Sequence, residues 1–259
     1  MAEPEWWEED YGFFGDFYIE GDNSNEGHKE QKKKLSERTK EESEGVIKLL
    51  KLKGNEIILD IPCGYGRHSI YLAGRGFKVT ASDINSKLIK TAKEMSKNLK
   101  IEWKKENMLE ITYNERFDVL INMFYSFGFF KTDKQNMEAL KRFYKSLKPK
   151  GKFLMHTDVN ILRIKNGKYK FNETRTLKSG KILKIKETFD EKINRIIGSW
   201  SIVDKNAEIK KNYSVRVYTE EEFSSMCREV GFKEVKVYGD WKGNKYSNGS
   251  EEMIIVAEK

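Results

Sequence analysis

The sequence of 259 residues has only two cysteines and three prolines, and it has no long hydrophobic run. Cys63 and Cys227 are too few for a disulfide framework, and their spacing does not match that of metal ligands. A membrane-spanning helix needs about 20 consecutive apolar residues, which the sequence nowhere offers. The first ten residues, MAEPEWWEED, lack the basic start and apolar core of a secretory signal. We therefore expect a cytoplasmic protein without a metal, a disulfide or a membrane segment.

The formal net charge of +8 is the feature that favours a nucleic-acid partner. However, the lysines are interleaved with glutamates, as in KLSERTKEESEG (34–45), and such mixing is typical of solvated faces. The content of 38% hydrophobic and 12% aromatic residues suits a folded soluble chain. No appended RNA-binding module is recognisable. Composition thus favours one folded core, or a core with an appendage, over a nucleic-acid-binding protein.

Short apolar runs alternate with amphipathic segments from residue 57 onward. The first run, Ile57–Ile58–Leu59, is continuous, as expected for a strand buried on both faces. Strands that alternate with helices indicate a parallel sheet covered on both sides. We predict strands at 57–61, 77–81, 101–104, 117–123, 152–158, 233–241 and 252–257, and helices at 31–52, 68–73, 85–98 and 133–147.

The pattern changes after Asn160. Residues 181–203 have period-two character broken by a polar turn at 190–192, which predicts antiparallel hairpins. Thr219, with Glu222 at the capping-box position, predicts the start of a last helix. We predict four parts: an aromatic lid with a mobile link (1–40), a cofactor-binding core (41–160), an antiparallel β insertion acting as a substrate cap (161–218), and a helix with two strands that complete the core (219–259).

The stretch LDIPCGYGRHS (59–69) predicts a ligand-binding loop. Its glycines lie between a buried strand and a helix, where a ligand can approach the backbone closely. The helix N-terminus favours an anion through its free N–H groups. Asp83, which lies 23 residues (83 − 60) beyond Asp60 and ends the next predicted strand, suits a pair of ribose hydroxyls. Together these features predict a nucleoside that carries an anionic group.

Three such ligands compete for this loop. A P-loop needs a Gly-Lys-Ser/Thr ending, and none follows Gly66. A dinucleotide fingerprint needs a third glycine, where this sequence has Ser69. The third candidate is S-adenosylmethionine, whose anionic group is a carboxylate.

Four motifs, in order and at matching intervals, resemble those of one superfamily. LDIPCGYGRHS followed by VTASDIN resembles motifs I and II of the class I S-adenosylmethionine-dependent methyltransferases. ENMLEITYNERFDVLINMFYSFGFF (106–130) resembles motifs III and IV of a small-molecule-type subgroup, and the hairpins after the fifth strand resemble that subgroup too. The resemblance implies a Rossmann-like α/β fold with a seven-stranded, mostly parallel sheet, helices on both faces, and an antiparallel β-hairpin insertion after strand 5.

The resemblance also implies roles for individual residues. Asp60 would fix the glycine loop, and Asp83 would hold the ribose hydroxyls. Two positions depart from the common pattern: Pro62 stands where many members have glycine, and Asn107 stands where aspartate is common. The residues expected to bind S-adenosylmethionine, with S-adenosylhomocysteine as product, are Asp60, Cys63, Gly64, Gly66, Asp83, Ile84, Asn107, Met108 and Met123.

The acceptor side is expected to vary among such enzymes, so these predictions come from position alone. His156, near the end of the fifth predicted strand, is the candidate catalytic residue. Tyr11 and Tyr18 are predicted to fold over the cofactor as a lid. The expected acceptor contacts are Tyr11, Tyr18, Tyr125, Arg216 and Tyr218.

We predict a methyltransferase acting on N, O or C of a small molecule, as a monomer or homodimer. One alternative is an RNA or other nucleic-acid methyltransferase. Against it, residues 122–125 read NMFY, without the Asn/Asp-Pro-Pro-Tyr/Phe motif. The other alternative is a protein that binds S-adenosylmethionine without catalysis.

Overall fold

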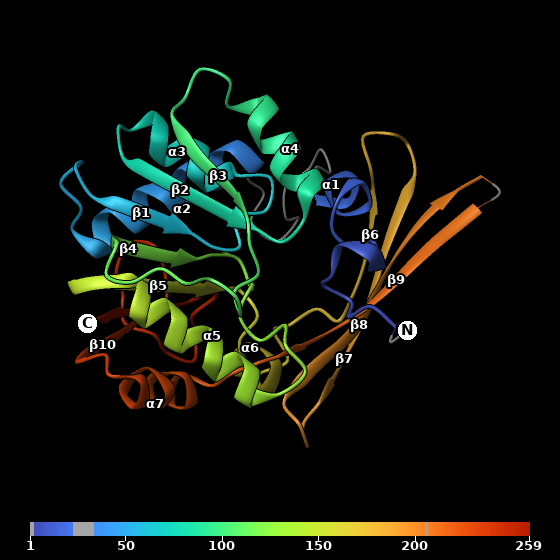
Figure 1. The fold of residues 1–259 in the computed structure, drawn as a ribbon. Coiled ribbons are helices and arrows are strands. Elements are labelled where there is room, and N and C mark those ends of the chain that lie inside the picture. Colours follow the sequence, from blue (N-terminus) through green and yellow to red (C-terminus); the bar gives the residue numbers. More distant parts are fainter. Residues whose placement is uncertain (1–2, 23–33, 206) are drawn as a thin grey trace.

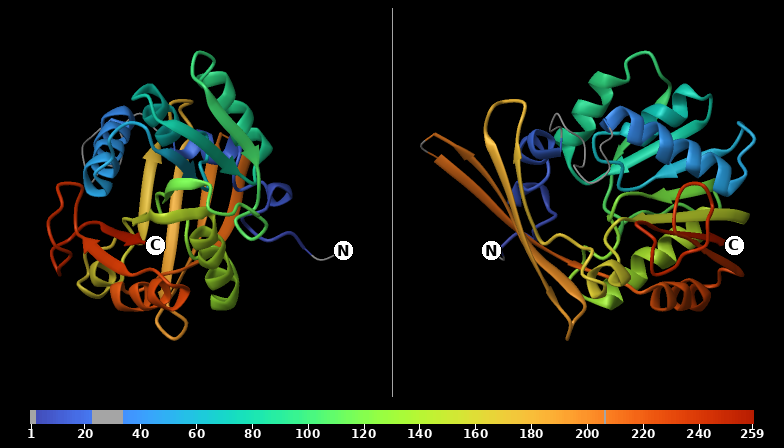
Figure 2. Two further views of the ribbon diagram at one scale, coloured as in Figure 1. Left: turned by 60° about the vertical axis from the view of Figure 1, so that its left-hand side comes forward. Right: turned by 180° about the vertical axis from the view of Figure 1, so that it is seen from behind.

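The computed structural model describes residues 3–22, 34–205 and 207–259. A layered α/β body lies beside a separate antiparallel sheet, and the N-terminal segment lies between the two (Figures 1 and 2). This segment contains a short 3-10 helix, Glu9–Tyr11, and helix α1, Asp16–Asp22. Most of the predicted mobile link falls on residues 23–33, outside the described residues.

The main sheet has seven strands in the order β10-β11-β5-β4-β1-β2-β3. The five strands from β5 to β3 are parallel, whereas β11 runs antiparallel to β5 and β10 runs antiparallel to β11. The predicted fold class is therefore confirmed. The strands are β1 Ile57–Asp60, β2 Lys78–Asp83, β3 Ile101–Lys105, β4 Phe117–Asn122, β5 Leu147–Thr157, β10 Glu234–Tyr238 and β11 Met253–Glu258.

Helices cover both faces of this sheet because its central strands are apolar on both sides. Ile58 and Val79 pack with α2, α3 and α4 on one face, and Leu59 and Phe153 pack with α5 and α7 on the other. Each of these four side chains is at most 4% exposed. The helices are α2 Leu35–Leu50, α3 Arg67–Gly74, α4 Ser86–Met95, α5 Asp133–Ser146 and α7 Glu220–Val230.

The insertion after β5 is a short helix followed by a four-stranded sheet of its own. Each strand pairs antiparallel with the next along the chain. The predicted hairpins are thus confirmed, and the predicted turn at 190–192 lies at the β7–β8 connection. One face of this sheet packs on aromatic side chains of the N-terminal segment. The elements are α6 Ile161–Lys165, β6 Asn172–Thr176, β7 Ile182–Asp190, β8 Arg195–Asp204 and β9 Ala207–Arg216.

Side-chain caps begin both α4 and α7, and the cap at Thr219 was predicted. Thr219 caps α7 in a capping box with Glu222, and the helix ends at Gly231 in the left-handed conformation. Asn85 caps α4, with its side chain accepting from the amides of residues 87 and 88, so Asp83 is left for another role. The largest boundary error is at β5, which begins at Leu147, five residues before 152, because a bulge lets this end pair with Phe117. The helix predicted at 85–98 ends at Met95, and the strand predicted at 233–241 ends at Tyr238.

No helix in the described part of the chain is long and apolar enough to cross a membrane.

Candidate functional site

The site lies at the carboxyl ends of the parallel strands. In the main sheet the strand order reverses between β1 and β4, and ligands of open α/β sheets bind outside the strand ends at such a point. Asp60 ends β1, Asp83 ends β2 and Asn122 ends β4. The topology therefore brings these three polar side chains to one edge of the sheet.

The glycine loop after β1 needs its glycines for two different reasons. Gly64 has a φ of 57° and nothing within 4 Å of a Cβ placed there, so this position is open to a ligand. Gly66 has a φ of 81°, and a Cβ there would lie 2.3 Å from the indole of Trp103. Gly66 thus allows α3 to start directly against β3, whereas Gly64 leaves the loop backbone accessible.

Asp83 holds the glycine loop in place. One carboxylate oxygen accepts a hydrogen bond from the Gly64 amide at 2.8 Å, and the other accepts one from the Asn85 amide at 2.9 Å. Burial raises the pKa of Asp83 to about 6, although these backbone hydrogen bonds lower it. Each oxygen retains a free lone pair for a further donor.

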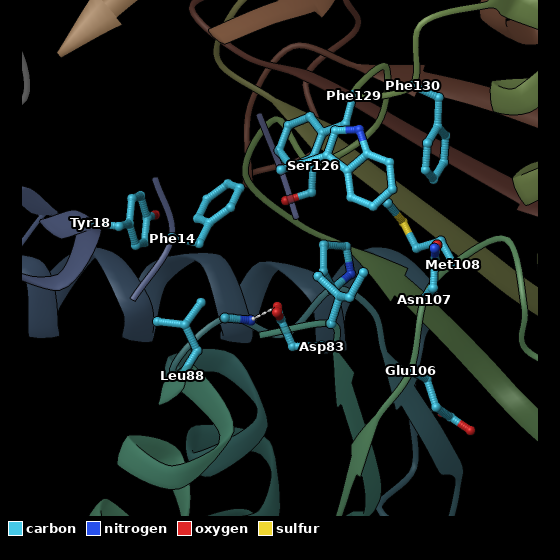
Figure 3. Close-up of a pocket in the computed structure, with 14 residues that line it drawn as sticks. Phe14, Tyr18, Asp83, Leu88, Glu106, Asn107, Met108, Ser126, Phe129 and Phe130 are labelled. Carbon is cyan, nitrogen blue, oxygen red and sulfur yellow. Dashed lines mark hydrogen bonds between the residues drawn. The ribbon is translucent and has the colours of Figure 1, made fainter. Parts of the chain in front are cut away.

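A cavity of about 600 Å³, which we call the glycine-loop cavity, opens above Asp83 (Figure 3). It includes four of the predicted cofactor residues, Gly64, Ile84, Asn107 and Met108, beside Asp83. The side chain of Glu106 points away from the others drawn in Figure 3. The remaining lining residues come mostly from the N-terminal segment and the 124–130 loop: Trp7, Phe14, Tyr18, Pro62, Leu88, Ser126, Phe129 and Phe130.

Asp60 is a buried carboxyl group with one unused oxygen. Its Oδ2 accepts from the Ser69 hydroxyl at 2.5 Å, and its Oδ1 is buried without a hydrogen-bond partner among the described residues. Burial raises the pKa of Asp60 to about 7. An unpaired buried oxygen is costly, and Asp60 is not among the residues that line the glycine-loop cavity.

Asp60→Asn is expected to change how stability depends on pH in the protein without ligand. A carboxyl group whose pKa rises from 3.8 to about 7 on folding contributes stability below pH 4, and this contribution is lost as pH rises through 7. The difference is at most about 4 kcal/mol. The Tm of wild type minus the Tm of Asp60→Asn should therefore be larger at pH 5 than at pH 8. Circular dichroism measures both values.

Asp118→Asn is the matched control for this titration. Asp118 lies on β4, and its pKa is lowered: burial raises it, but Lys148 and the Ile57 amide outweigh that effect. Its contribution to stability is fully present above pH 5 and is lost only below pH 4, so the difference in Tm between wild type and Asp118→Asn should be the same at pH 5 and pH 8. The expectation is contradicted if the difference in Tm between wild type and Asp60→Asn is the same at pH 5 and pH 8.

A second, smaller cavity continues from the first along the glycine loop, and we call it the Met123 cavity. Its volume is about 390 Å³, and it includes Cys63 and Met123, both predicted cofactor residues. The thiol of Cys63 is buried, and burial raises its pKa, so it lacks the character of a nucleophile. Gly66 lines neither cavity and acts through the close approach to Trp103.

A third and larger cavity, of about 1130 Å³, lies between the N-terminal segment, the 124–130 loop and the inner face of the second sheet. We call it the aromatic cavity, since ten aromatic side chains line it. It shares four residues with the glycine-loop cavity: Phe14, Tyr18, Ser126 and Phe129. The aromatic residues are Trp6, Phe13, Phe14, Tyr18, Phe124, Tyr125, Phe129, Tyr169, Trp200 and Tyr213.

The predicted acceptor contacts divide into two groups. Tyr18 and Tyr125 line the aromatic cavity. The side chain of Tyr11 instead contacts β9, where its hydroxyl accepts a hydrogen bond from the Asn212 amide at 2.9 Å. Arg216 and Tyr218 line none of the three cavities.

These last two residues belong to the junction of β9 with α7. Arg216 forms an ion pair with Glu222 at 2.8 Å, and the Tyr218 hydroxyl donates to Asp133 at 2.8 Å. Both side chains are less than a tenth exposed. Their observed contacts are therefore those of residues that join two elements.

His156, the candidate catalytic residue, is buried below the 124–130 loop. Its Nδ1 accepts from the Phe124 amide at 3.3 Å, and its Nε2 is hydrogen-bonded to Glu252. The ring lies 4.8 Å from that of Trp241, and it lines none of the three cavities. These contacts suit a positioning role, because Phe124 and Tyr125 both adopt a left-handed φ.

Sequence reasoning missed most of the aromatic cavity. Phe14, Trp200 and Tyr213 are far apart in the chain, and nothing in their local pattern separates them from core residues. Glu187 did carry a signal, since it interrupts an otherwise apolar period-two row in LKIKETF (183–189). In the described ranges, no group of three or more His, Cys, Asp or Glu side chains is placed to hold a metal ion.

Comparison with known proteins gives consistent matches. The methyltransferase domain family matches residues 58–151. A glycine/sarcosine N-methyltransferase from Halorhodospira halochloris is 25% identical over 230 residues, which cover 86% of this chain and 82% of the relative.

Solved structures match over nearly the whole chain. The CcbJ methyltransferase from Streptomyces caelestis has a TM-score of 0.75 at 15% identity, covering 95% of this chain and 96% of that one. CalS10, an amino pentose methyltransferase from Micromonospora echinaspora with bound S-adenosylmethionine, has a TM-score of 0.65 at 16% identity, covering 87% and 92%. At these identities the structural likeness shows the fold alone.

Proposed function

We propose that this chain, which belongs to the class I S-adenosylmethionine-dependent methyltransferases, methylates a small-molecule acceptor bound in the aromatic cavity. The observation that carries the proposal is the wall common to two cavities, formed by Phe14, Tyr18, Ser126 and Phe129. A cofactor in the glycine-loop cavity and an acceptor in the aromatic cavity would meet along this wall.

The residues of the glycine-loop cavity fit S-adenosylmethionine. The Asp83 carboxylate lines this cavity and retains lone pairs for the ribose hydroxyls, whereas Asp60 lines none of the three cavities. Gly64 leaves its backbone open for a close approach. On the other side, Ile84 and Asn107 are suited to the face and the edge of the adenine. We assign Cys63 and Met123 to the methionine side, because both line the Met123 cavity.

S-adenosylmethionine, when bound, supplies an electrophilic methyl group, which forms a bond to the acceptor while the carbon–sulfur bond breaks and its electron pair stays on sulfur. The chain itself has to orient the acceptor and exclude water. The aromatic side chains that the two cavities share, Phe14, Tyr18 and Phe129, suit exclusion of water. Ser126 lies where the cavities meet, and its hydroxyl donates to the Met123 carbonyl at 2.8 Å.

The lining of the aromatic cavity supports a small acceptor. Many aromatic side chains with a smaller number of polar groups are typical of pockets that hold small molecules. The N-terminal segment and the second sheet stand where a duplex or a folded RNA would have to approach (Figure 2). The names of the relatives point the same way, since glycine, sarcosine and an amino pentose are small molecules.

We also propose that the N-terminal segment is a lid. Phe14 and Tyr18 line both cavities, and the segment is tied to the glycine loop by the Tyr65 hydroxyl, which donates to Asp22 at 2.6 Å. Deletion of residues 1–20 removes three aromatic side chains that line the cofactor site, Trp7, Phe14 and Tyr18. We expect binding of S-adenosylhomocysteine to be weaker by at least roughly tenfold in calorimetry, the effect of losing even one buried ring. Deletion of residues 1–5, which removes no lining side chain, is the control, and equal affinity of both deletion variants would contradict a lid.

A methyl-transfer assay tests the proposed function. Purified protein is incubated with S-adenosylmethionine carrying a labelled methyl group and with panels of amines, alcohols, thiols and total RNA. We expect label in a small molecule and formation of S-adenosylhomocysteine. Label only in RNA would support the nucleic-acid alternative, and tight cofactor binding without any product would support a non-catalytic protein.

A further inference from the structure

We infer that the acceptor carries a basic amine, and that Glu187 on β7 binds this amine inside the aromatic cavity. The inference rests on the proposed methyl transfer to a small molecule and names the chemical class of that molecule. Glu187 lines the aromatic cavity and does not line the glycine-loop cavity, so it faces the acceptor side.

Glu187 lies in a row that is otherwise apolar. Along β7, Lys184 and Lys186 are exposed on the outer face, whereas Leu183 and Ile185 are buried on the inner face. Because strand side chains alternate, Glu187 belongs to the inner row. Placing a carboxylate in such a row costs free energy unless hydrogen bonds or an opposite charge compensate.

The neighbouring strands are built around this carboxylate. Gly198 on β8 pairs with Glu187 on one side and with Tyr213 on the other. A Cβ at Gly198 would lie 2.6 Å from the Tyr213 ring and 2.9 Å from Cγ of Glu187. The φ of Gly198 is not positive, so this glycine provides space and not an unusual backbone conformation. Through that space the Tyr213 hydroxyl donates to Oε1 of Glu187.

The hydrogen bonds of Glu187 orient it without neutralising it. Its Oε2 accepts from the Tyr169 hydroxyl at 2.7 Å, so each carboxylate oxygen receives one neutral donor and keeps a lone pair. No ion pair joins Glu187 to a cationic side chain in the described part of the chain. Arg175, in the same cavity, is held by Glu173 through two bonds of 2.6 and 2.7 Å.

The lining of the cavity has more carboxylates than cations, which favours a cationic ligand over an anionic one: the carboxylates are Asp22, Asp158, Glu173 and Glu187, and the cations are Arg163, Lys170 and Arg175. The rings of Tyr18 and Trp200 stack 5.8 Å apart in the same cavity, and aromatic faces attract cations. The Tyr125 hydroxyl is buried without a hydrogen-bond partner among the described residues, which leaves a polar atom for the ligand. Glu187 would repel an anion, and a hydroxyl ligand would leave its charge without compensation.

A pair of matched ligands tests the inference. Benzylamine and benzyl alcohol have nearly the same shape and differ in charge, so each is titrated by calorimetry into protein saturated with S-adenosylhomocysteine. We expect wild type to bind benzylamine roughly 10- to 100-fold more tightly than benzyl alcohol, the range of one charge-assisted hydrogen bond. Glu187→Gln, which keeps the shape and removes the charge, should abolish this preference and leave affinity for the alcohol unchanged.

Two further variants separate recognition from folding. Asp158→Asn removes one carboxylate from the same cavity without releasing Arg175 from Glu173, and it should keep most of the preference for the amine. Glu187→Asp keeps the charge and should keep part of the preference for the amine. Affinity for S-adenosylhomocysteine should be the same in all variants, which shows that each is folded.

The inference is overturned if wild type does not prefer the amine, or if Glu187→Gln prefers it as strongly as wild type does. It is also overturned if labelled methyl groups reach alcohols but no amine, although methyl transfer to a small molecule would then stand. Failure of wild type to bind S-adenosylhomocysteine would instead contradict the proposed function. The two failures are therefore distinguishable.

Discussion

Asp83→Asn should weaken binding of S-adenosylhomocysteine by roughly 100-fold, because it removes a charged acceptor from two backbone hydrogen bonds and from the proposed ribose contact. In the wild type, the carboxylate oxygens of Asp83 accept hydrogen bonds from the Gly64 and Asn85 amides at 2.8 and 2.9 Å. The amide group of asparagine would turn an N–H donor toward one of those N–H groups. Buried hydrogen bonds to a charged group contribute about 1.5–3 kcal/mol each, and about 3 kcal/mol corresponds to more than a hundredfold in Kd. Calorimetric titration measures the change directly.

Asp118→Asn is the matched control for the loss of affinity. Its carboxylate also accepts a backbone hydrogen bond, from the Ile57 amide at 2.8 Å. Asp118 lies near the start of β4, at the opposite edge of the sheet from the glycine loop. This variant should bind S-adenosylhomocysteine with unchanged affinity. Similar affinities for wild type and Asp83→Asn would mean that Asp83 supports the loop only, and the cofactor assignment of this residue would be wrong.

The sequence was sufficient for the parts of the fold that depend on local patterns. The apolar run at Ile57–Leu59, the glycines after it and the carboxylate at Asp83 occupy the expected strand, loop and strand end. Capping at Thr219 was equally readable, because a cap depends on residues three or four positions away. These features place the glycine-loop cavity at the edge of the sheet.

The acceptor side could not be predicted in the same way because it depends on contacts between distant segments. Tyr11 and Tyr18 are seven residues apart, yet Tyr11 contacts β9 whereas Tyr18 lines the aromatic cavity. His156 follows the expected strand, but the side that its ring faces depends on Glu252 in the segment before β11. Only strand register, which no local pattern reveals, brings Glu187 opposite Gly198.

Gly128→Ala should be the most destabilising of the glycine substitutions considered, with a loss of about 3 kcal/mol or more in the free energy of unfolding. Gly128 has a φ of +101°, and a Cβ there would lie 2.2 Å from the carbonyl oxygen of Arg216. The Gly128 carbonyl also accepts from the Arg216 amide at 2.9 Å, so the two backbones are in direct contact. A left-handed φ costs a residue with a Cβ about 1–2 kcal/mol, and the forced displacement adds about 1–3 kcal/mol. Urea unfolding measures the sum.

Gly54→Ala separates these two contributions. Gly54 has nearly the same φ, +106°, but nothing lies within 4 Å of a Cβ built on it, so only the backbone cost of about 1–2 kcal/mol applies. The additional loss in Gly128→Ala then measures the contact between the 124–130 loop and the end of β9. Since Phe129, next to Gly128, lines both the glycine-loop and the aromatic cavities, this contact links the second sheet to the cofactor site. Equal losses in the two variants would mean that the loop moves aside at no cost, and the second sheet could not then hold the acceptor at a fixed place relative to the cofactor.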